Sequence, residues 1–167
     1  MMFLYLVRHA DAKNEEEDPV RALSEKGIQD ITRIASYIWQ LNLKVLGIFH
    51  SSKLRAKQTA EILFEYLKPL KGLSEVDGLS PLDNPDVWAA RLRGIHEDAV
   101  LVGHLPHLAR LASLLLCGSS EKNIVTFRTA GVICLERDDA GAWSLQWMLN
   151  PDIVLGEKGI GYSCDSL

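Results

Sequence analysis

A chain of 167 residues, of which 47% are apolar and 24% charged, can bury a sizeable core, so its composition excludes a disordered protein and favours one globular domain over 1–167. The net charge of −4 argues against long-range attraction to nucleic acid or to an anionic membrane, but does not exclude a local basic pocket. Its apolar runs are all shorter than the ~18 residues of a membrane span.

The N-terminal half predicts strands and helices in alternation. The opening run "MMFLYLV" lacks a basic segment before it and a small-residue cleavage site after it, so it predicts a buried strand over 2–7 rather than a signal peptide. A polar loop over 13–22 follows, and we expect its acidic run Glu15–Asp18 to be solvated. A helix then starts at Ser24, with Glu25 in its first turn and apolar residues at helical spacing: Ile28, Ile31, Ile34, Ile38 and Leu41. A short strand over 45–49 precedes a helix over 53–67, whose expected buried stripe is Leu54, Ile62, Leu63 and Tyr66.

The C-terminal half continues the alternation and ends in two strands. Glycine and proline mark 71–86 as a loop with a short strand near 73–76, and a helix follows Asn84-Pro85 because proline suits a first helical turn. The later elements expected are a strand over 99–103, a helix over 106–117, and strands over 131–136 and 143–149. The turn "RDDAGA" predicts that the last two strands form a hairpin, and residues 152–167 are expected to be a loosely held tail.

This order of elements predicts an α/β fold. Strands that alternate with helices favour a three-layer αβα sandwich, with a mostly parallel central sheet, helices on both faces and a C-terminal β-hairpin. Ligand sites in such folds lie at the carboxyl ends of the strands.

Basic side chains follow the expected ends of separate strands. Arg8 and His9 follow the first strand, "HSSKLR" with Arg55 follows the second, and His104 follows the strand over 99–103. Each of these residues alone has an ordinary explanation as a surface or hydrogen-bonded group. Their joint placement at strand ends predicts instead that they converge on an anion.

The remaining histidines have less to suggest a function. His50 and His96 are expected to be structural or surface residues, and His107 follows His104 closely enough that a metal-binding pair is conceivable. We disfavour a metal because there is no His-Glu-x-x-His motif and no pattern of carboxylates to complete a site. Glycine-rich nucleotide-binding motifs are also absent from the sequence.

Several blocks together resemble a known family. "RHADA" (8–12), "SSKLRAKQTAEIL" (51–63) and "LVGHLPHL" (101–108) are similar to the histidine phosphatase superfamily, which includes the phosphoglycerate mutases. The similarity is greatest to its short bacterial branch, the SixA-type phosphohistidine phosphatases, and "VRALSEKG" (20–27) and "WSLQWMLNP" (143–151) support it. The order and spacing of the blocks extend over nearly the whole chain.

The resemblance implies a role for each basic residue. His9 is the nucleophile, and Arg8, Arg55 and His104 hold the phosphoryl group, with a protonated His104 as a further positive donor. Arg21, before the first helix, reaches the phosphate in the SixA branch. No cofactor or metal is implied.

The sequence departs from the family at two places. The usual Ser-Pro before the second helix is Ser51-Ser52 here, which leaves Arg55 in place. Many members have a glutamate general acid in the region that reads "EVDGLSPLD" (75–83), and the alignment puts Gly78 at its position. Asp11, Asp77 and Asp83 are weak candidates to replace it.

These observations predict a metal-independent phosphatase that acts through a phosphohistidine intermediate on phosphohistidine in a protein, such as a phosphorelay domain. A small-molecule phosphomonoesterase of the same family is the alternative, and a catalytically inactive phosphate-binding module is the alternative from another class. Neither nucleic acid nor a membrane is expected as a partner. The three cysteines, Cys117, Cys134 and Cys164, are far apart and odd in number, which argues against disulfides and suggests the cytoplasm.

Overall fold

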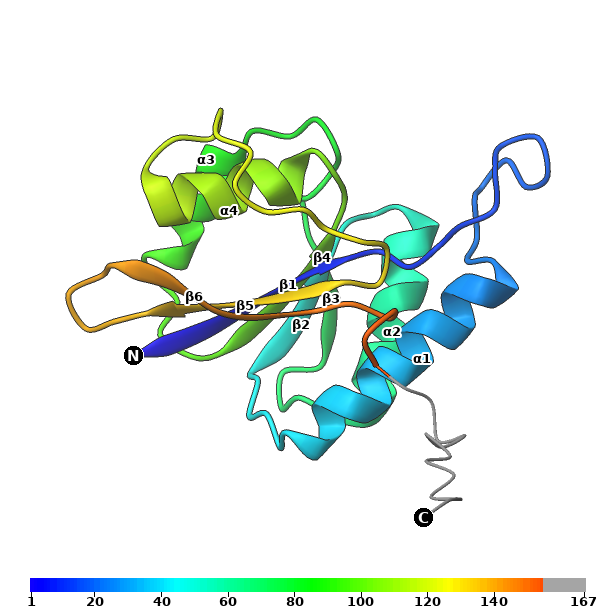
Figure 1. Ribbon diagram of the computed structural model, residues 1–167, viewed down its shortest axis with the longest axis horizontal. Helices are drawn as coiled ribbons and strands as arrows, with labels where there is room; N and C mark the ends of the chain where they lie inside the picture. The colour runs from blue at the N-terminus through cyan, green and yellow to red at the C-terminus, as the bar shows by residue number, and fades with distance from the viewer. Residues whose placement is uncertain (155–167) are drawn as a thin grey trace, which may run out of the picture.

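A computed structural model describes residues 1–154, which form four helices and one six-stranded sheet (Figure 1). The expected tail over 152–167 therefore falls almost entirely outside the described residues, and so does Cys164. The strands are β1 (Met2–Arg8), β2 (Gly47–His50), β3 (Leu73–Glu75), β4 (Ala99–Gly103), β5 (Val132–Arg137) and β6 (Trp143–Leu149). The helices are α1 (Glu25–Gln40), α2 (Leu54–Leu67), α3 (Pro85–Leu92) and α4 (His107–Cys117).

The strand order confirms the expected mostly parallel sheet. It is β3-β2-β4-β1-β5-β6, in which β3, β2, β4 and β1 are parallel, while β5 pairs antiparallel with both β1 and β6. The hairpin forms as expected, because Asp138 accepts the amides of Gly141 and Ala142 in its turn, and Gly141 takes the left-handed φ of +89° that favours glycine.

Two apolar cores, one on each face of the sheet, make the sandwich three-layered. Side chains of β1 alternate between them, since Tyr5 and Val7 pack with α1 and α2, whereas Leu4 and Leu6 pack with α3 and α4. Figure 1 shows α1 and α2 together on one side of the sheet and α3 and α4 on the other. Both faces of the central strands are therefore buried, which explains their continuous apolar runs.

The helix α1 begins as predicted, but its buried face is shifted. Ser24 caps the helix by accepting the amide of Gly27 at 3.0 Å. Ile31, Ile34 and Ile38 are buried, whereas Ile28 is 48% exposed and Leu41 45%. Gly27 takes the inward position of the first turn, because an added Cβ there would lie 2.0 Å from the carbonyl oxygen of Asp11.

The predicted stripe of α2 is wrong except for Leu63. The buried residues of this helix are Ala56, Thr59, Ala60 and Leu63, while Leu54, Ile62 and Tyr66 are only half-buried. Small residues on the inner face let the helix lie close to the sheet, so the longer side chains lie at its flanks. The other elements end within one or two residues of their predicted limits. Among the described helices, none is long and apolar enough to cross a membrane.

Candidate active site

The carboxyl ends of β1, β2 and β4 are hydrogen-bonded to one another, and this brings the candidate residues together. His9 donates its amide to the carbonyl of Gly103 at 3.0 Å, and Ser51 donates its amide to Val102 at 3.2 Å. The imidazole rings of His9 and His104 consequently lie with their centroids 5.0 Å apart. Residues separated by 95 positions in the chain thus meet at one edge of the sheet, as the parallel topology predicted.

The His9 ring is held in one orientation by the backbone. Its Nδ1 lies 2.7 Å from the carbonyl oxygen of Ala10, which can only accept, so Nδ1 carries the proton of the neutral ring and Nε2 keeps a free lone pair. The pKa of His9 is lowered to about 4, mainly by burial and also by the positive charges of Arg55, Arg8 and Arg21, while the hydrogen bond to the Ala10 carbonyl opposes them. His9 is therefore neutral at pH 7, with the lone pair of Nε2 unprotonated.

Three arginines surround this ring. Arg8 donates from Nη1 to the carbonyl of Phe127 at 2.9 Å. Burial lowers the pKa of both Arg8 and Arg55, and the charge of Arg21 lowers that of Arg55 further. The buried Nε atoms of Arg8 and Arg55 have no hydrogen-bond partner among residues 1–154. Concentrated positive charge with unused donors is the environment that an anion such as phosphate stabilises.

The His104 ring is held by Ser51, a residue to which the sequence analysis gave no role. Its Nε2 lies 2.5 Å from the hydroxyl oxygen of Ser51, which also accepts the amide of Lys53 at 3.4 Å. This contact orients the imidazole with its other nitrogen, Nδ1, away from Ser51. The buried Nδ1 has no hydrogen-bond partner within the described part of the chain, and a ligand would supply one.

The expectation of a protonated His104 is wrong for the free protein. Burial lowers the pKa of His104 to about 3, and the charges of His9 and Arg55 are the next largest causes. His104 is therefore neutral at pH 7 in the free protein, and a nearby phosphate dianion would raise its pKa again.

Thr59 joins the backbone beside His9 to α2, and the sequence analysis also gave it no role. Its hydroxyl accepts the amide of Ala10 at 3.0 Å and donates to the carbonyl of Arg55 at 2.7 Å. This buried side chain fixes the backbone beside His9 relative to the first turn of α2, where Arg55 lies. Ser51 and Thr59 both belong to the block 51–63, but their residue types are too common to be singled out by sequence alone.

The structure disfavours a side chain at position 78, where the resemblance places the general acid of many family members. Gly78 has a φ of +78°, and an added Cβ would lie 3.3 Å from atoms of the Trp88 indole. A side chain at this position is therefore disfavoured by both the backbone conformation and the space.

The three aspartates considered as replacements are engaged elsewhere. Asp11 accepts the hydroxyl of Ser24 at 2.5 Å, and Asp83 accepts the amide of Ser80 at 2.8 Å. Asp77 forms an ion pair with Arg91 at 2.7 Å and is 83% exposed. Their carboxylates serve as local caps and surface partners.

The other three histidines differ in burial and in hydrogen bonding. His50 is buried and its Nδ1 lies 2.8 Å from the carbonyl of Ser51, while His96 is exposed, so both are structural or surface residues as expected. His107 is fully buried, and neither ring nitrogen has a partner in residues 1–154. In that same range, no cluster of three or more His, Cys, Asp or Glu is arranged to hold a metal ion.

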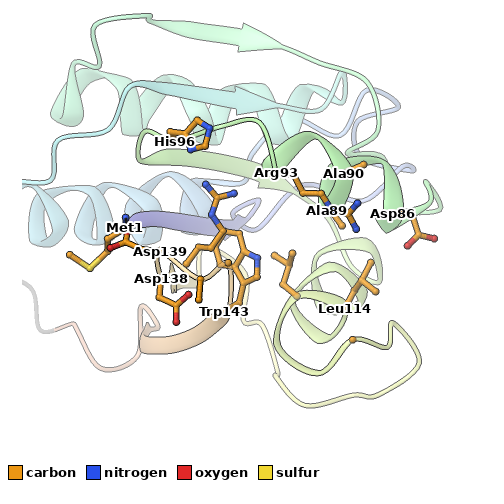
Figure 2. A pocket seen from close by; sticks show the side chains of 15 residues that line it. Met1, Asp86, Ala89, Ala90, Arg93, His96, Leu114, Asp138, Asp139 and Trp143 are labelled. Carbon is orange, nitrogen blue, oxygen red and sulfur yellow. Dashed lines mark hydrogen bonds and ion pairs between the residues drawn. The ribbon is translucent and has the colours of Figure 1, made fainter.

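A cavity of about 880 Å³ lies beside the amino end of β1, and Arg8, His9 and His104 are not part of it (Figure 2). Residues of α3, the end of α4 and the hairpin line it, and Figure 2 shows His96, Arg93 and Trp143 around it. Met1 and Arg137 also line it. Met1 directly precedes β1, and Arg137 is the last residue of β5, where it pairs with Met2. Arg8, His9, Arg21, Arg55 and His104 do not line this cavity.

Comparison with known proteins agrees with this arrangement. A model of the histidine phosphatase superfamily (branch 1) matches residues 4–84. An uncharacterised protein of Picosynechococcus sp. is 36% identical over 162 residues, which cover 92% of this chain and 94% of the relative. The phosphohistidine phosphatase SixA of Escherichia coli (strain K12) is 23% identical over 155 residues, which cover 90% of this chain and 94% of that protein.

Solved structures share the fold. The protein histidine phosphatase SixA complexed with tungstate has a TM-score of 0.79 at 23% identity, covering 90% of this chain and 98% of that chain. A phosphoserine phosphatase mutant from Entamoeba histolytica, in complex with phosphoserine, has a TM-score of 0.69 at 14% identity, covering 93% and 100%.

The chain is an α/β sandwich in which two histidines and neighbouring arginines gather at the carboxyl ends of the parallel strands. The chain belongs to the histidine phosphatase superfamily, and among the relatives it matches is SixA. Membership of this superfamily supports a phosphatase activity.

Proposed function

We propose that this chain is a metal-independent phosphatase that forms a phosphohistidine at His9 and acts on phosphohistidine in a protein. The arginines and His104 would bind the phosphoryl group, because forked guanidinium donors match the oxygens of a phosphate. Two or more positive charges would balance the roughly two negative charges of that group without a metal ion.

The first step is attack by Nε2 of His9 on phosphorus. The bond from phosphorus to the leaving group breaks, and the phosphoryl group becomes bonded to Nε2. Arg8, Arg55 and Arg21 stabilise the charge that the transition state spreads over the equatorial oxygens. Water then attacks the phosphohistidine, which releases inorganic phosphate and returns His9 to its neutral form.

The absence of an acid at position 78 is the observation that favours a phosphohistidine substrate. An alkyl phosphate such as phosphoserine must expel an alkoxide, whose pKa resembles that of water at ~16, and a positioned acid typically contributes about 10²–10⁴-fold to such a reaction. The imidazole of phosphohistidine has a reference pKa near ~6.5, so solvent can protonate its free nitrogen and let it leave as neutral imidazole. Gly78, crowded by Trp88, supports the second kind of substrate.

The test compares two peptides of the same sequence, one with phosphohistidine and one with phosphoserine, in EDTA. We expect kcat/KM for the phosphohistidine peptide to be greater by at least about a hundredfold, the lower end of a general-acid contribution. Asp77→Asn and Asp83→Asn should each change phosphohistidine turnover by less than about tenfold, too little for a general acid.

The other outcomes distinguish the alternatives. A serine ester that reacts equally well, or an essential aspartate, would mean that an acid is present and would favour a phosphomonoesterase. Loss of activity in EDTA would contradict the metal-independent mechanism. Binding of phosphate without turnover of any phosphorylated compound would indicate a phosphate-binding module.

A further inference from the structure

The acidic run between β1 and α1 is not one solvated segment. Glu15, Glu16 and Glu17 are exposed as expected, but Asp18 is half-buried. Its carboxylate is directed to the backbone, where Oδ1 accepts the amide of Val20 at 3.2 Å and Oδ2 accepts the amide of Ala22 at 2.9 Å. Asp18 therefore differs from its neighbours in what its charge contacts.

The carbonyl of Asp18 completes this arrangement by accepting the amide of Arg21 at 2.9 Å. Three consecutive backbone amides, from Val20 to Ala22, are thus bound by one residue. An aspartate that binds nearby backbone amides fixes the conformation of a loop that has no strand or helix to do so.

The conformation fixed in this way is unusual. Arg21 has a φ of +53°, in the left-handed region that residues with a Cβ seldom adopt. Such backbone persists only where the surrounding contacts impose it, and these conformations occur most often at functional sites. The amides on either side of Arg21 are the ones that the Asp18 carboxylate holds.

The loop also holds the Arg21 side chain itself. Its Nε donates to the carbonyl of Lys13 at 3.1 Å, and Lys13 in turn donates its amide to Ala22 at 2.9 Å. This leaves the terminal nitrogens of the guanidinium as donors for an anion. The positive charge of Arg21 is among the causes that lower the pKa of His9 and of Arg55.

We propose that Asp18 is a positioning residue that holds Arg21 in the geometry required to bind the phosphoryl group. Unlike Arg8, His9 and His104, Arg21 does not follow directly from the end of a strand, so the sheet does not position it. The inference rests on the proposed function, in which Arg21 binds phosphate. Asp18 itself would not touch the substrate.

A double-mutant cycle tests this role. Asp18→Ala, Arg21→Ala and the double variant are compared with the wild type by two measurements, kcat/KM for the phosphohistidine peptide and the affinity for orthovanadate as a phosphate analogue. Because a small misplacement of a positioning group can cost up to about a hundredfold, we expect Asp18→Ala to reduce kcat/KM by at least about tenfold. On the Arg21→Ala background, the same change should have less than about a twofold effect on both measurements.

Control variants separate positioning from charge and from stability. Glu16→Ala removes a neighbouring exposed carboxylate and should leave both measurements within about twofold of the wild type. Asp18→Asn keeps one acceptor oxygen and should cause a smaller loss in the same direction, which gives a milder variant if Asp18→Ala fails to fold. Thermal melts show which variants are folded at the assay temperature.

The results that would overturn the inference are distinct from those that would overturn the proposed function. Equal effects of Asp18→Ala with and without Arg21 would show that Asp18 acts independently, and an equal loss in Glu16→Ala would assign the effect to net charge. A wild-type protein that turns over neither peptide would contradict the proposed function, while the vanadate cycle would still report whether Asp18 positions Arg21.

Discussion

The buried histidine beside the site provides a prediction whose size follows from the structure. His107 begins α4, is fully buried, and has no partner for either ring nitrogen among residues 1–154. Burial lowers its pKa to about 4, and the charge of Arg110 acts in the same direction, while that of Asp83 opposes it. The perturbation is His107→Leu, with His107→Gln as a polar variant that does not titrate.

The direction in which the free energy of unfolding changes with pH follows from proton binding. Between pH 6.5 and about 4, the unfolded chain protonates this histidine and the folded protein does not, so the free energy of unfolding falls as the pH is lowered through this window. At 1.36 kcal/mol per pH unit, His107 accounts for a loss of about 2 kcal/mol between pH 7.5 and pH 5.0. Both variants should lack this part of the loss. At pH 7.5, His107→Leu should be at least as stable as the wild type, because it removes buried polar atoms that have no partner.

The assay is urea denaturation followed by circular dichroism at both pH values. All other ionisable groups are common to the proteins compared, so the difference between their pH-dependent losses isolates His107. The exposed His96 gives a matched control, since His96→Gln should lose as much stability as the wild type. Equal losses in the wild type and His107→Leu would refute the reasoning.

Two further predictions concern catalysis. His9→Ala should abolish turnover while vanadate still binds, because the arginines and His104 remain. Rapid-quench labelling should give an acid-labile, base-stable phosphoenzyme in the wild type alone. Turnover by a wild-type protein that never labels at His9 would contradict a covalent route. Ser51→Ala should lower kcat by about 10–10²-fold, because His104 loses its orienting partner. Ser51→Thr keeps the hydroxyl and should recover much of the rate. An unchanged rate in Ser51→Ala would show that His104 needs no such partner.

The sequence alone determined the architecture and the position of the central groups. Apolar runs of strand length, helical spacing of isoleucines and the Ser24 cap are local patterns, and each depends on residues a few positions apart. Parallel topology then requires that the ends of β1, β2 and β4 meet, so Arg8, His9 and His104 could be grouped without coordinates.

Only the tertiary structure decided the contacts that act on those groups. Ser51 bonds to His104 across 53 positions and Thr59 to Ala10 across 49, and such common residue types give no local signal for partners so far away. Likewise, burial determined that His104 is neutral in the free protein, since desolvation depends on every element packed around a ring.

The loop before α1 shows the same division within a few residues. The sequence displayed four consecutive acidic residues, Glu15 to Asp18, that composition alone treats as equivalent and solvated. The folded backbone separates them, because Asp18 accepts the amides of Val20 and Ala22 in a turn in which Arg21 has a left-handed φ. Charge is a property of the sequence, but the group that a charge contacts is set by the path of the chain in space.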